Sequence, residues 1–281
     1  MCEYCTKHGE GKKWYLRAEN YSDDLMSDLR RRRFIEGFFG RPDKLEAKMG
    51  SVTSLKRLPS FLQAVMKPIL IRQEKKTHYG QVLPIEDVEE ILGFVSSVTR
   101  FSCICRHINV GTEQRYCYGL SLLPAADSQF FRLMRSIDAE YLNGPDTSGL
   151  EAIPKEEALD QMRNLDREGV FHSIWTLLAP CTATLCNCDM DCLAFKATTV
   201  QDFPVMFRAE YVADVDPDRC TGCRACMTGC SFAAIRYRLA HKKVDIDPTA
   251  CYGCGVCRAQ CHKDAIVMKD RSSVPLAANI W

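Results

Sequence analysis

The sequence has no long apolar run and almost no net charge. No stretch approaches the ~18 apolar residues of a membrane-spanning helix, so no membrane span is expected. The 281 residues include 37 basic and 36 acidic side chains, a net charge of +1. This balance gives no reason to expect a nucleic-acid partner. The first residues are too polar for a secretion signal, and we therefore expect a cytoplasmic protein.

Several motifs of nucleotide-binding and hydrolytic enzymes are also missing. The chain contains no G-x-x-x-x-G-K-[ST] phosphate loop, no strand-linked G-x-G-x-x-G turn and no G-x-S-x-G elbow. These absences argue against a nucleotide-driven or esterase-like reaction. They leave a bound flavin as an open alternative.

Cysteine is what the sequence has in excess, with 17 residues. In a reducing cytoplasm, dense cysteine indicates metal or redox chemistry, and an odd number fits poorly with complete disulfide pairing. Eight of these cysteines form two runs of the same spacing, C-x2-C-x2-C-x3-C, at 220–230 and 251–261. Gly222 and Gly253 align at the same offset, so the sequence indicates a duplicated unit.

This spacing suits an iron–sulfur cubane. Three close thiolates can wrap one cluster, while the fourth points away towards a second cluster. Gly222 and Gly253 stand where the chain must turn sharply beside the inorganic body. Zinc is the alternative, but zinc sites favour two separate CxxC pairs over runs of four cysteines.

Over about 55 residues this repeat resembles the bacterial-type two-cluster ferredoxin. The resemblance implies two [4Fe–4S] clusters with crossed ligands: Cys220, Cys223, Cys226 and Cys261 for cluster I, and Cys251, Cys254, Cys257 and Cys230 for cluster II. Ser231 and His262 replace the proline that usually follows the fourth cysteine. That proline is not a ligand, so the departure bears on the cluster potentials and leaves the ligand set unchanged.

The charge of the repeat differs from that of free ferredoxins of this type, which are usually acidic. From Asp214 to Asp270 it carries seven acidic and nine basic side chains. This predicts docking to an acidic surface or incorporation into a larger assembly. The alternative is that the bases offset the negative clusters.

A second cysteine-rich region lies upstream of the repeat. Its cysteines are Cys103, Cys105, Cys117, Cys181, Cys186, Cys188 and Cys192. Apolar spacing predicts one helix that starts at Pro84 and another that starts at Pro154 and stops at Gly169, and each helix leads into one cysteine group. We therefore place both groups on loops or short extended pieces and expect a cavity between them as a third metal site.

The ligands of this third site are open from the sequence. One set combines Cys103, Cys105 and Cys117 with a fourth cysteine from the 181–192 group. The other uses Cys181, Cys186, Cys188 and Cys192. Some of these thiols could instead be buried free cysteines, which behave as small apolar residues.

The N-terminal Cys2, Cys5 and His8 form a weaker candidate. They could bind zinc, contribute to an upstream cluster, or bind no metal. A helix is expected from Ser22 to about Phe34, with the arginines at 30–33 as its solvated end.

Three further polar residues accompany the upstream cysteines. Arg106 and His107 follow a C-x-C pair directly, and a cation beside a cluster would stabilise its reduced state and raise its potential. His172 could be a ligand, a proton donor or an ordinary core histidine.

The pattern CICRH…C…GVFH…CNC…C, followed by the repeat, resembles a loosely characterised family of ferredoxin-domain proteins from anaerobic bacteria and archaea. The match covers about 85–270 and supports the architecture more than an activity. We predict an α+β protein with a mostly helical, cysteine-bearing N-terminal domain and a C-terminal two-cluster ferredoxin-like domain. The expected segments are a helical region at 1–82, a cysteine-rich domain at 83–210, the ferredoxin domain at 211–270 and a tail at 271–281.

The predicted function is electron transfer. Such a protein would relay low-potential single electrons between redox proteins or enzyme subunits in an oxygen-avoiding cell, as a component of an oxidoreductase complex. The alternative is an enzyme whose upstream cluster or flavin reduces a substrate, with Arg106, His107 and His172 as polar candidates. A redox or metal sensor is a third hypothesis.

Overall fold

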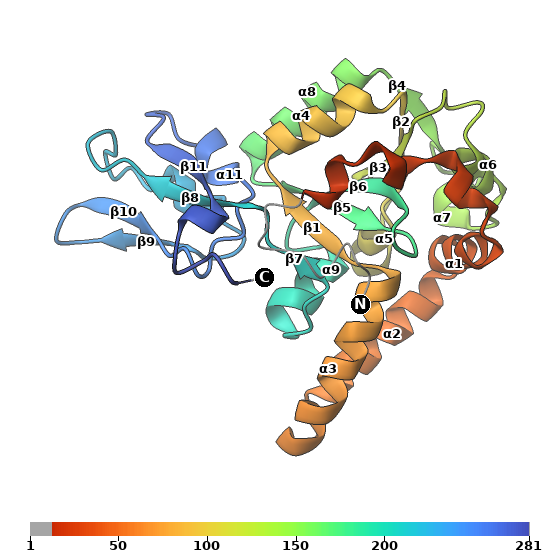
Figure 1. Cartoon of the computed structure of the whole chain (residues 1–281), viewed down its shortest axis with the longest axis horizontal. Coiled ribbons are helices and arrows are strands. Elements are labelled where there is room, and N and C mark those ends of the chain that lie inside the picture. The colour runs from red at the N-terminus through yellow and green to blue at the C-terminus, as the bar shows by residue number, and fades with distance from the viewer. Residues whose placement is uncertain (1–12, 281) are drawn as a thin grey trace.

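A computed structural model describes residues 13–280. The part up to residue 210 is built around a seven-stranded sheet with the order β4-β2-β3-β6-β5-β1-β7 (Figure 1). Its strands are β1 Gly80–Leu83, β2 Ser97–Phe101, β3 Cys117–Ser121, β4 Glu151–Ile153, β5 Phe171–Thr176, β6 Thr182–Cys188 and β7 Met206–Phe207. All neighbouring strands are antiparallel except β1 and β7, which pair in parallel.

Helices cover both faces of this sheet. Its helical segments are η1 Trp14–Leu16, η2 Ala18–Tyr21, η3 Asp23–Ser27, α1 Leu29–Gly40, α2 Pro42–Leu55, α3 Ser60–Thr77, α4 Ile85–Phe94, α5 Ile104–Val110, α6 Gln129–Ser136, α7 Glu140–Asn143, α8 Lys155–Glu168, α9 Leu193–Phe195 and η4 Lys196–Val200. Strand side chains alternate between faces, so Ile174 and Leu185 join the core beneath α4 and α8. The opposite face carries the cysteines.

The two helices expected after Pro84 and Pro154 are α4 and α8. Val88, Ile91 and Leu92 of α4 are buried, as their spacing predicts. Helix α8 ends at Gly169, whose φ of +96° is the left-handed C-terminal cap that glycine favours. The α+β class predicted from the sequence is confirmed. The sequence reading did not foresee the extent of the sheet.

The helix expected from Ser22 to Phe34 is divided in two. Ser22 caps the short η3 helix, and the Asp28 side chain accepts a hydrogen bond from the Arg30 N–H to start α1. The arginine run therefore lies at the start of α1. Arg31 is buried and donates to the carbonyl oxygens of Leu177, at 3.3 Å, and Leu178, at 3.0 Å. This corrects the expectation of a fully solvated helix end.

Helices α2 and α3 form a hairpin that projects from the body (Figure 1). Helix α3 buries none of its side chains and exposes Phe61, Val65 and Ile69. No helix within residues 13–280 is long and apolar enough to cross a membrane.

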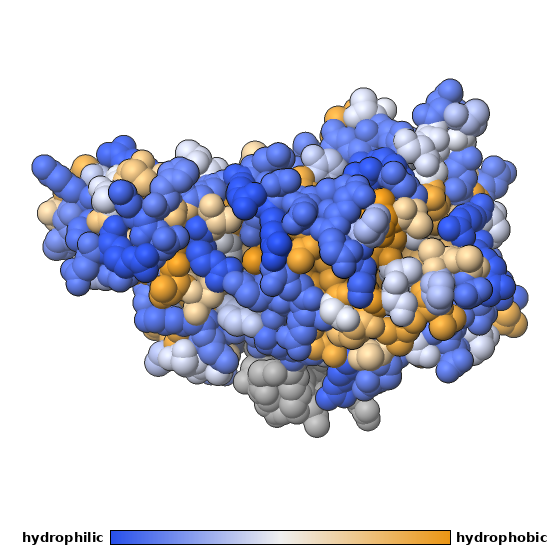
Figure 2. Space-filling model, turned by 90° about the horizontal axis from the view of Figure 1, so that it is seen from above, coloured by the Kyte–Doolittle hydropathy of each residue, from blue (hydrophilic) through white to orange (hydrophobic). Residues whose placement is uncertain are grey.

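The C-terminal part, 211–270, is a small two-layer unit that we call the module. Its elements are β8 Tyr211–Val215, α10 Ala225–Thr228, β9 Ile235–Arg238, β10 Lys243–Ile246, α11 Val256–Ala259 and β11 Ile266–Asp270, followed by η5 Arg271–Ser273. β8 pairs with β11 and β9 pairs with β10. In Figure 2 the module end presents mostly hydrophilic residues, whereas hydrophobic residues gather over the larger part.

Polar contacts fix the module to the larger part. The buried Asp87 of α4 accepts hydrogen bonds from Tyr15 at 2.6 Å and from Tyr211 of β8 at 2.9 Å, and it pairs with Lys13 at 2.8 Å. Arg258 of α11 forms an ion pair with Glu86. The module therefore has a defined orientation on α4.

Candidate iron–sulfur sites

The module contains two cavities, each lined by four cysteines. Cys220, Cys223, Cys226 and Cys261 line one of about 340 Å³. Cys230, Cys251, Cys254 and Cys257 line the other, also of about 340 Å³. Each cavity combines three cysteines of one run with the last cysteine of the other run. The fold thus brings together the two sets that the ferredoxin resemblance implies.

The two copies also share their backbone geometry. The N–H of Ala234 donates to the sulfur of Cys230 at 3.3 Å, and the N–H of Ala265 donates to Cys261 at 3.3 Å. Such N–H···S bonds stabilise a thiolate. Gly222 has φ +71°, and a Cβ there would lie 2.0 Å from the Lys242 carbonyl oxygen. Glycine is therefore required at this turn.

The surroundings of the two cavities differ. Cys223 of the first set is exposed, whereas Cys251 and Cys257 of the second are buried. The second cavity also faces the larger part of the protein. Cys254 belongs to the same hydrophobic cluster as Cys188 and Cys192. The first cavity is therefore the outer one and the second is the inner one.

Aromatic rings fill the space between the inner cavity and the sheet. Phe232 stacks on Tyr252 with centroids 4.0 Å apart, and both follow ligand candidates closely in the chain. Phe232 also contacts Phe171 at 4.9 Å and Phe195 at 5.5 Å. Sequence reasoning missed these residues. The available sequence signal was the position of two aromatic residues beside cysteines in an otherwise polar module.

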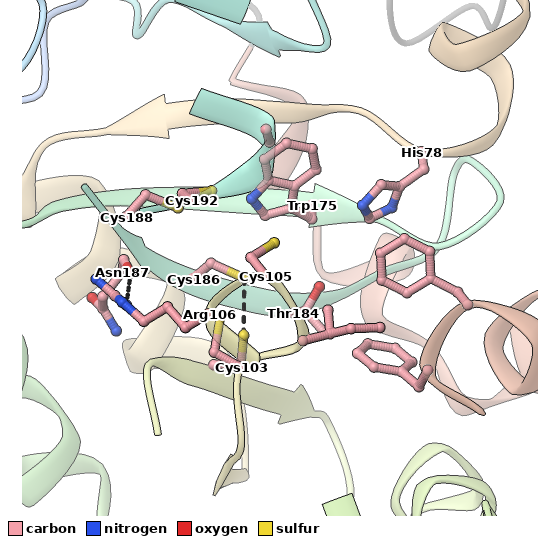
Figure 3. Close-up of a pocket in the computed structure, with 15 residues that line it drawn as sticks. His78, Cys103, Cys105, Arg106, Trp175, Thr184, Cys186, Asn187, Cys188 and Cys192 are labelled. Atoms are coloured by element: carbon pink, nitrogen blue, oxygen red, sulfur yellow. Dashed lines mark hydrogen bonds between the residues drawn. The ribbon is translucent and has the colours of Figure 1, made fainter. Parts of the chain in front are cut away.

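A third cavity, of about 540 Å³, lies on the face of the sheet opposite α4 and α8 (Figure 3). We call it the sheet cavity. Six of the seven upstream cysteines line it, namely Cys103, Cys105, Cys117, Cys186, Cys188 and Cys192. Cys181 does not. It is packed among apolar residues at the start of β6, and burial raises the pKa of its thiol to about 12.

Strand register explains three of these positions. Cys117 of β3 lies opposite Cys186 of β6, and their sulfurs are 3.5 Å apart. Cys188 is two residues farther along β6 and therefore points to the same side. Of the expected loops or short extended pieces, Cys117, Cys186 and Cys188 take the extended form, because the alternating pattern 182–188 continues the sheet.

Helix starts explain two more. Cys103 is the N-cap of α5 and Cys192 is the N-cap of α9. The backbone N–H groups of Arg106 and Phe195, three residues on in each case, help to lower the pKa of these two thiols. Cys105 lies in the first turn of α5. An N-cap sulfur faces unpaired N–H groups, and this favours the thiolate.

The six thiols influence one another's ionisation. The sulfurs of Cys117 and Cys186 are 3.5 Å apart, and neighbouring thiols shift the pKa of Cys103, Cys105, Cys188 and Cys192. Hydrogen bonds from Cys105 and Cys117 lower the pKa of Cys103, and those from Cys105 and Cys188 lower the pKa of Cys192. Cys103 and Cys192 are therefore the thiols that ionise most readily.

Arg106 supplies a buried cation to the sheet cavity. Its guanidinium donates to the Asn187 carbonyl oxygen at 3.1 Å, pairs with Asp189 and lies 3.5 Å above the Tyr116 ring. A positive charge here compensates for thiolates and for a negatively charged cluster. His107 does not line the cavity, because its ring stacks on Tyr141 at 4.7 Å.

His172 lies on the other face of the sheet. It is fully buried, its Nδ1 is 2.7 Å from the Asn187 side-chain oxygen, and its Nε2 is 3.6 Å from Asp166 of α8. Burial lowers the pKa of His172 to about 4 and raises that of Asp166 to about 7. The structure therefore favours the core-histidine interpretation over a role as ligand.

Sequence reasoning also missed His78 and Trp175 in the wall of the sheet cavity. Their rings stack at 4.9 Å (Figure 3). Gly80 makes room for the indole, since a Cβ there would lie 2.4 Å from it. Trp175 shares a face with Ser173, which lies opposite Cys186. The alternation of side chains along β5 was the sequence signal that could have placed Trp175 on the cavity face.

Six thiols line the sheet cavity, more than the four ligands that a single zinc ion takes in proteins. Among residues 13–280, no three cysteine, histidine or acidic side chains converge on one ion-sized point. The module cavities behave in the same way, because a cubane holds its thiolates at separate corners. Cys2, Cys5 and His8 lie outside the described residues.

Comparison with known proteins identifies part of the chain. Residues 213–262 match the family described as a 4Fe-4S dicluster domain. No curated protein and no solved structure matches the chain. The dicluster domain implies two [4Fe–4S] clusters and, in general terms, iron–sulfur electron transfer.

Proposed function

We propose that this chain relays low-potential single electrons between a redox partner and a third [4Fe–4S] cluster held in the sheet cavity. The observation that carries the proposal is the single hydrophobic cluster that contains Cys254 of the inner cavity together with Cys188 and Cys192 of the sheet cavity. A cubane with four thiolate ligands exchanges electrons one at a time without binding substrate. Three such centres in sequence would make a path through the molecule.

The ligand sets are part of this proposal. Cluster I takes Cys220, Cys223, Cys226 and Cys261, and cluster II takes Cys230, Cys251, Cys254 and Cys257. Their grouping around two separate cavities supports this assignment. The third cluster takes four of the six thiols of the sheet cavity. We assign Cys103 and Cys192 to it, because both line the cavity at the N-caps of α5 and α9, where unpaired N–H groups favour the thiolate.

The outer cavity is the entry point for a partner. Cys223 is exposed there, and the exposed side chains of Arg224 and Lys263 line the cavity. A basic rim favours a redox protein or subunit with an acidic surface, because complementary charge speeds association and fixes orientation. The exposure of Cys223 would leave a cluster there open to oxygen, and this supports an oxygen-avoiding cytoplasm as its setting. The upstream resemblance to ferredoxin-domain proteins of anaerobes adds support.

The test uses serine variants of the N-cap cysteines. Serine is itself a good N-cap, so Cys103→Ser and Cys192→Ser remove the sulfur and keep the helix start. Anaerobically purified wild type should contain about twelve irons, and each variant about eight. Cys181→Ser is the matched control, because Cys181 is buried nearby but lies outside the cavity, and it should keep all twelve. Eight irons in the wild type would refute the third cluster.

A second candidate function is a reductase with a substrate site in the larger part. The observation that favours it is an apolar cavity that continues from the sheet cavity towards the α2–α3 hairpin. Turnover of a small-molecule acceptor by the isolated chain would support this function over a pure relay.

A further inference from the structure

A fourth cavity, of about 630 Å³, adjoins the sheet cavity. We call it the side chamber. Phe38, His78, Cys105, Trp175 and Ala194 line both spaces, so the two are continuous. Helices α1, α2 and α3 form one wall of the side chamber, and the segment 193–205 forms the other.

The walls of the side chamber are mostly apolar and aromatic. Phe34, Phe38, Trp175 and Phe203 contribute rings, and a flat apolar ring compound packs well among such rings. Only three charged or titratable side chains other than cysteine line it. Lys48 and Glu74 form an ion pair at 2.7 Å, with Lys48 half exposed, and His78 lies at the junction with the sheet cavity.

The hydrogen bonds of His78 define what it can recognise. Its Nδ1 lies 2.6 Å from the Thr176 carbonyl oxygen, which can only accept, so Nδ1 carries the proton. Neutral Nε2 is then an acceptor, and it has no hydrogen-bond partner among residues 13–280. It suits a hydroxyl group on a ligand. Lys48, which also lines the chamber, can donate to an oxygen substituent of the ligand.

We propose that the side chamber binds an apolar ring compound with a hydroxyl group and a second oxygen substituent, as in the reduced forms of quinones. His78 Nε2 would accept from the ring hydroxyl, Lys48 would donate to the second oxygen, and the aromatic side chains would enclose the ring. A role for this ligand in electron exchange rests on the proposed function. The binding itself depends only on the side chains of this chain.

The experiment measures binding by equilibrium dialysis with the full chain, purified without air and left oxidised. The probe is 4-methoxy-1-naphthol, whose hydroxyl can donate to His78 Nε2 and whose ether oxygen can accept from Lys48. We expect saturable binding of one molecule per chain. Val52→Trp fills the chamber from α2 and should weaken binding at least about tenfold. Val65→Trp is the matched control on the exposed face of α3 and should leave binding unchanged.

His78→Phe tests the hydrogen bond separately from the ring contacts. The phenyl ring can keep the stack on Trp175 but has no acceptor, so affinity should fall about tenfold. Equal binding by wild type, Val52→Trp and His78→Phe would overturn the proposal, as would the absence of saturable binding. Iron is counted on the same samples. Eight irons with binding that Val52→Trp weakens would refute the third cluster and support the chamber.

Discussion

The module and the sheet cavity both gather cysteines, but they do so by different means. In the module, eight thiols come from two short loops, and Cys226, Cys251 and Cys257 are themselves part of the small buried core. In the sheet cavity, six thiols come from two strands and two short helices that belong to a much larger core. We infer that the metal organises the module, whereas the sheet organises its own cavity before any metal binds.

The largest expected effect is the unfolding of the module while the seven-stranded sheet stays folded. Cys254→Ser or Cys223→Ser should abolish electron transfer and unfold 211–270, because a unit this small has little core without its clusters. Hydrogen exchange should show lost amide protection in β8 to β11 and retained protection in β3, β5 and β6. A variant that keeps a protected module and full electron transfer would contradict the comparison.

A smaller effect is expected when alanine replaces either of two glycines of the module, and its size should differ between them. Gly222 and Gly255 both have positive φ, but a Cβ at Gly222 would lie 2.0 Å from a carbonyl oxygen, whereas the nearest atom at Gly255 is 3.6 Å away. Gly255→Ala should cost about 1–2 kcal/mol, the usual penalty for this conformation. Gly222→Ala should cost more than about 3 kcal/mol, because the loop must also shift. Anaerobic thermal unfolding measures both, and equal losses would argue against the tight turn at Gly222.

The smallest expected effect is a change in the free energy of unfolding with pH, and it arises at Asp166 on helix α8, which packs on the sheet. The pKa of the buried Asp166 is raised to about 7 from its ordinary value of 3.8. Between these values the unfolded chain has released this proton and the folded chain has kept it, so stability falls as pH rises. From pH 5.5 to 7 this loss is about 2 kcal/mol, at about 1.4 kcal/mol per pH unit.

Asp166→Asn removes that loss. Relative to wild type, the variant should therefore become more stable as the pH is raised from 5.5 to 8. His172, 3.6 Å from Asp166, contributes in the opposite direction because its pKa is lowered, but only below its ordinary value of 6.5. The rise from pH 6.5 to 8 is therefore the part of the difference that reports on Asp166. Asp160→Asn, on the exposed side of α8, is the control. A constant difference in melting temperature across this range would show that Asp166 is ionised in the folded state.

The same contrast explains what the sequence could predict. The sequence predicted the two cysteine sets of the module because its candidate ligands repeat within two short runs. The spacing within each run is enough to indicate a cluster-binding loop. Helices α4 and α8 could be predicted from apolar periodicity and from Pro84, Pro154 and Gly169. In both cases the information is local.

For the sheet cavity, the sequence predicted a site between the two upstream cysteine groups but left its ligands open. Its sulfurs are neighbours because β3 and β6 are adjacent, and no spacing reveals that Cys117 and Cys186 lie opposite each other 69 residues apart. The displacement of Cys181 from the cavity depends on the same strand order. Arg31 was misjudged because its partners, the carbonyl groups of Leu177 and Leu178, come from a distant turn.

The alternation of side chains along β6 has a further consequence. Leu185 and Asn187 point towards α4 and α8, and Cys186 and Cys188 point the other way. A slip of one residue in the pairing of this strand would exchange the two sets together. The thiols of β6 are thus kept or lost jointly, and a single insertion within the strand would remove two of the six thiols from the sheet cavity without changing any cysteine.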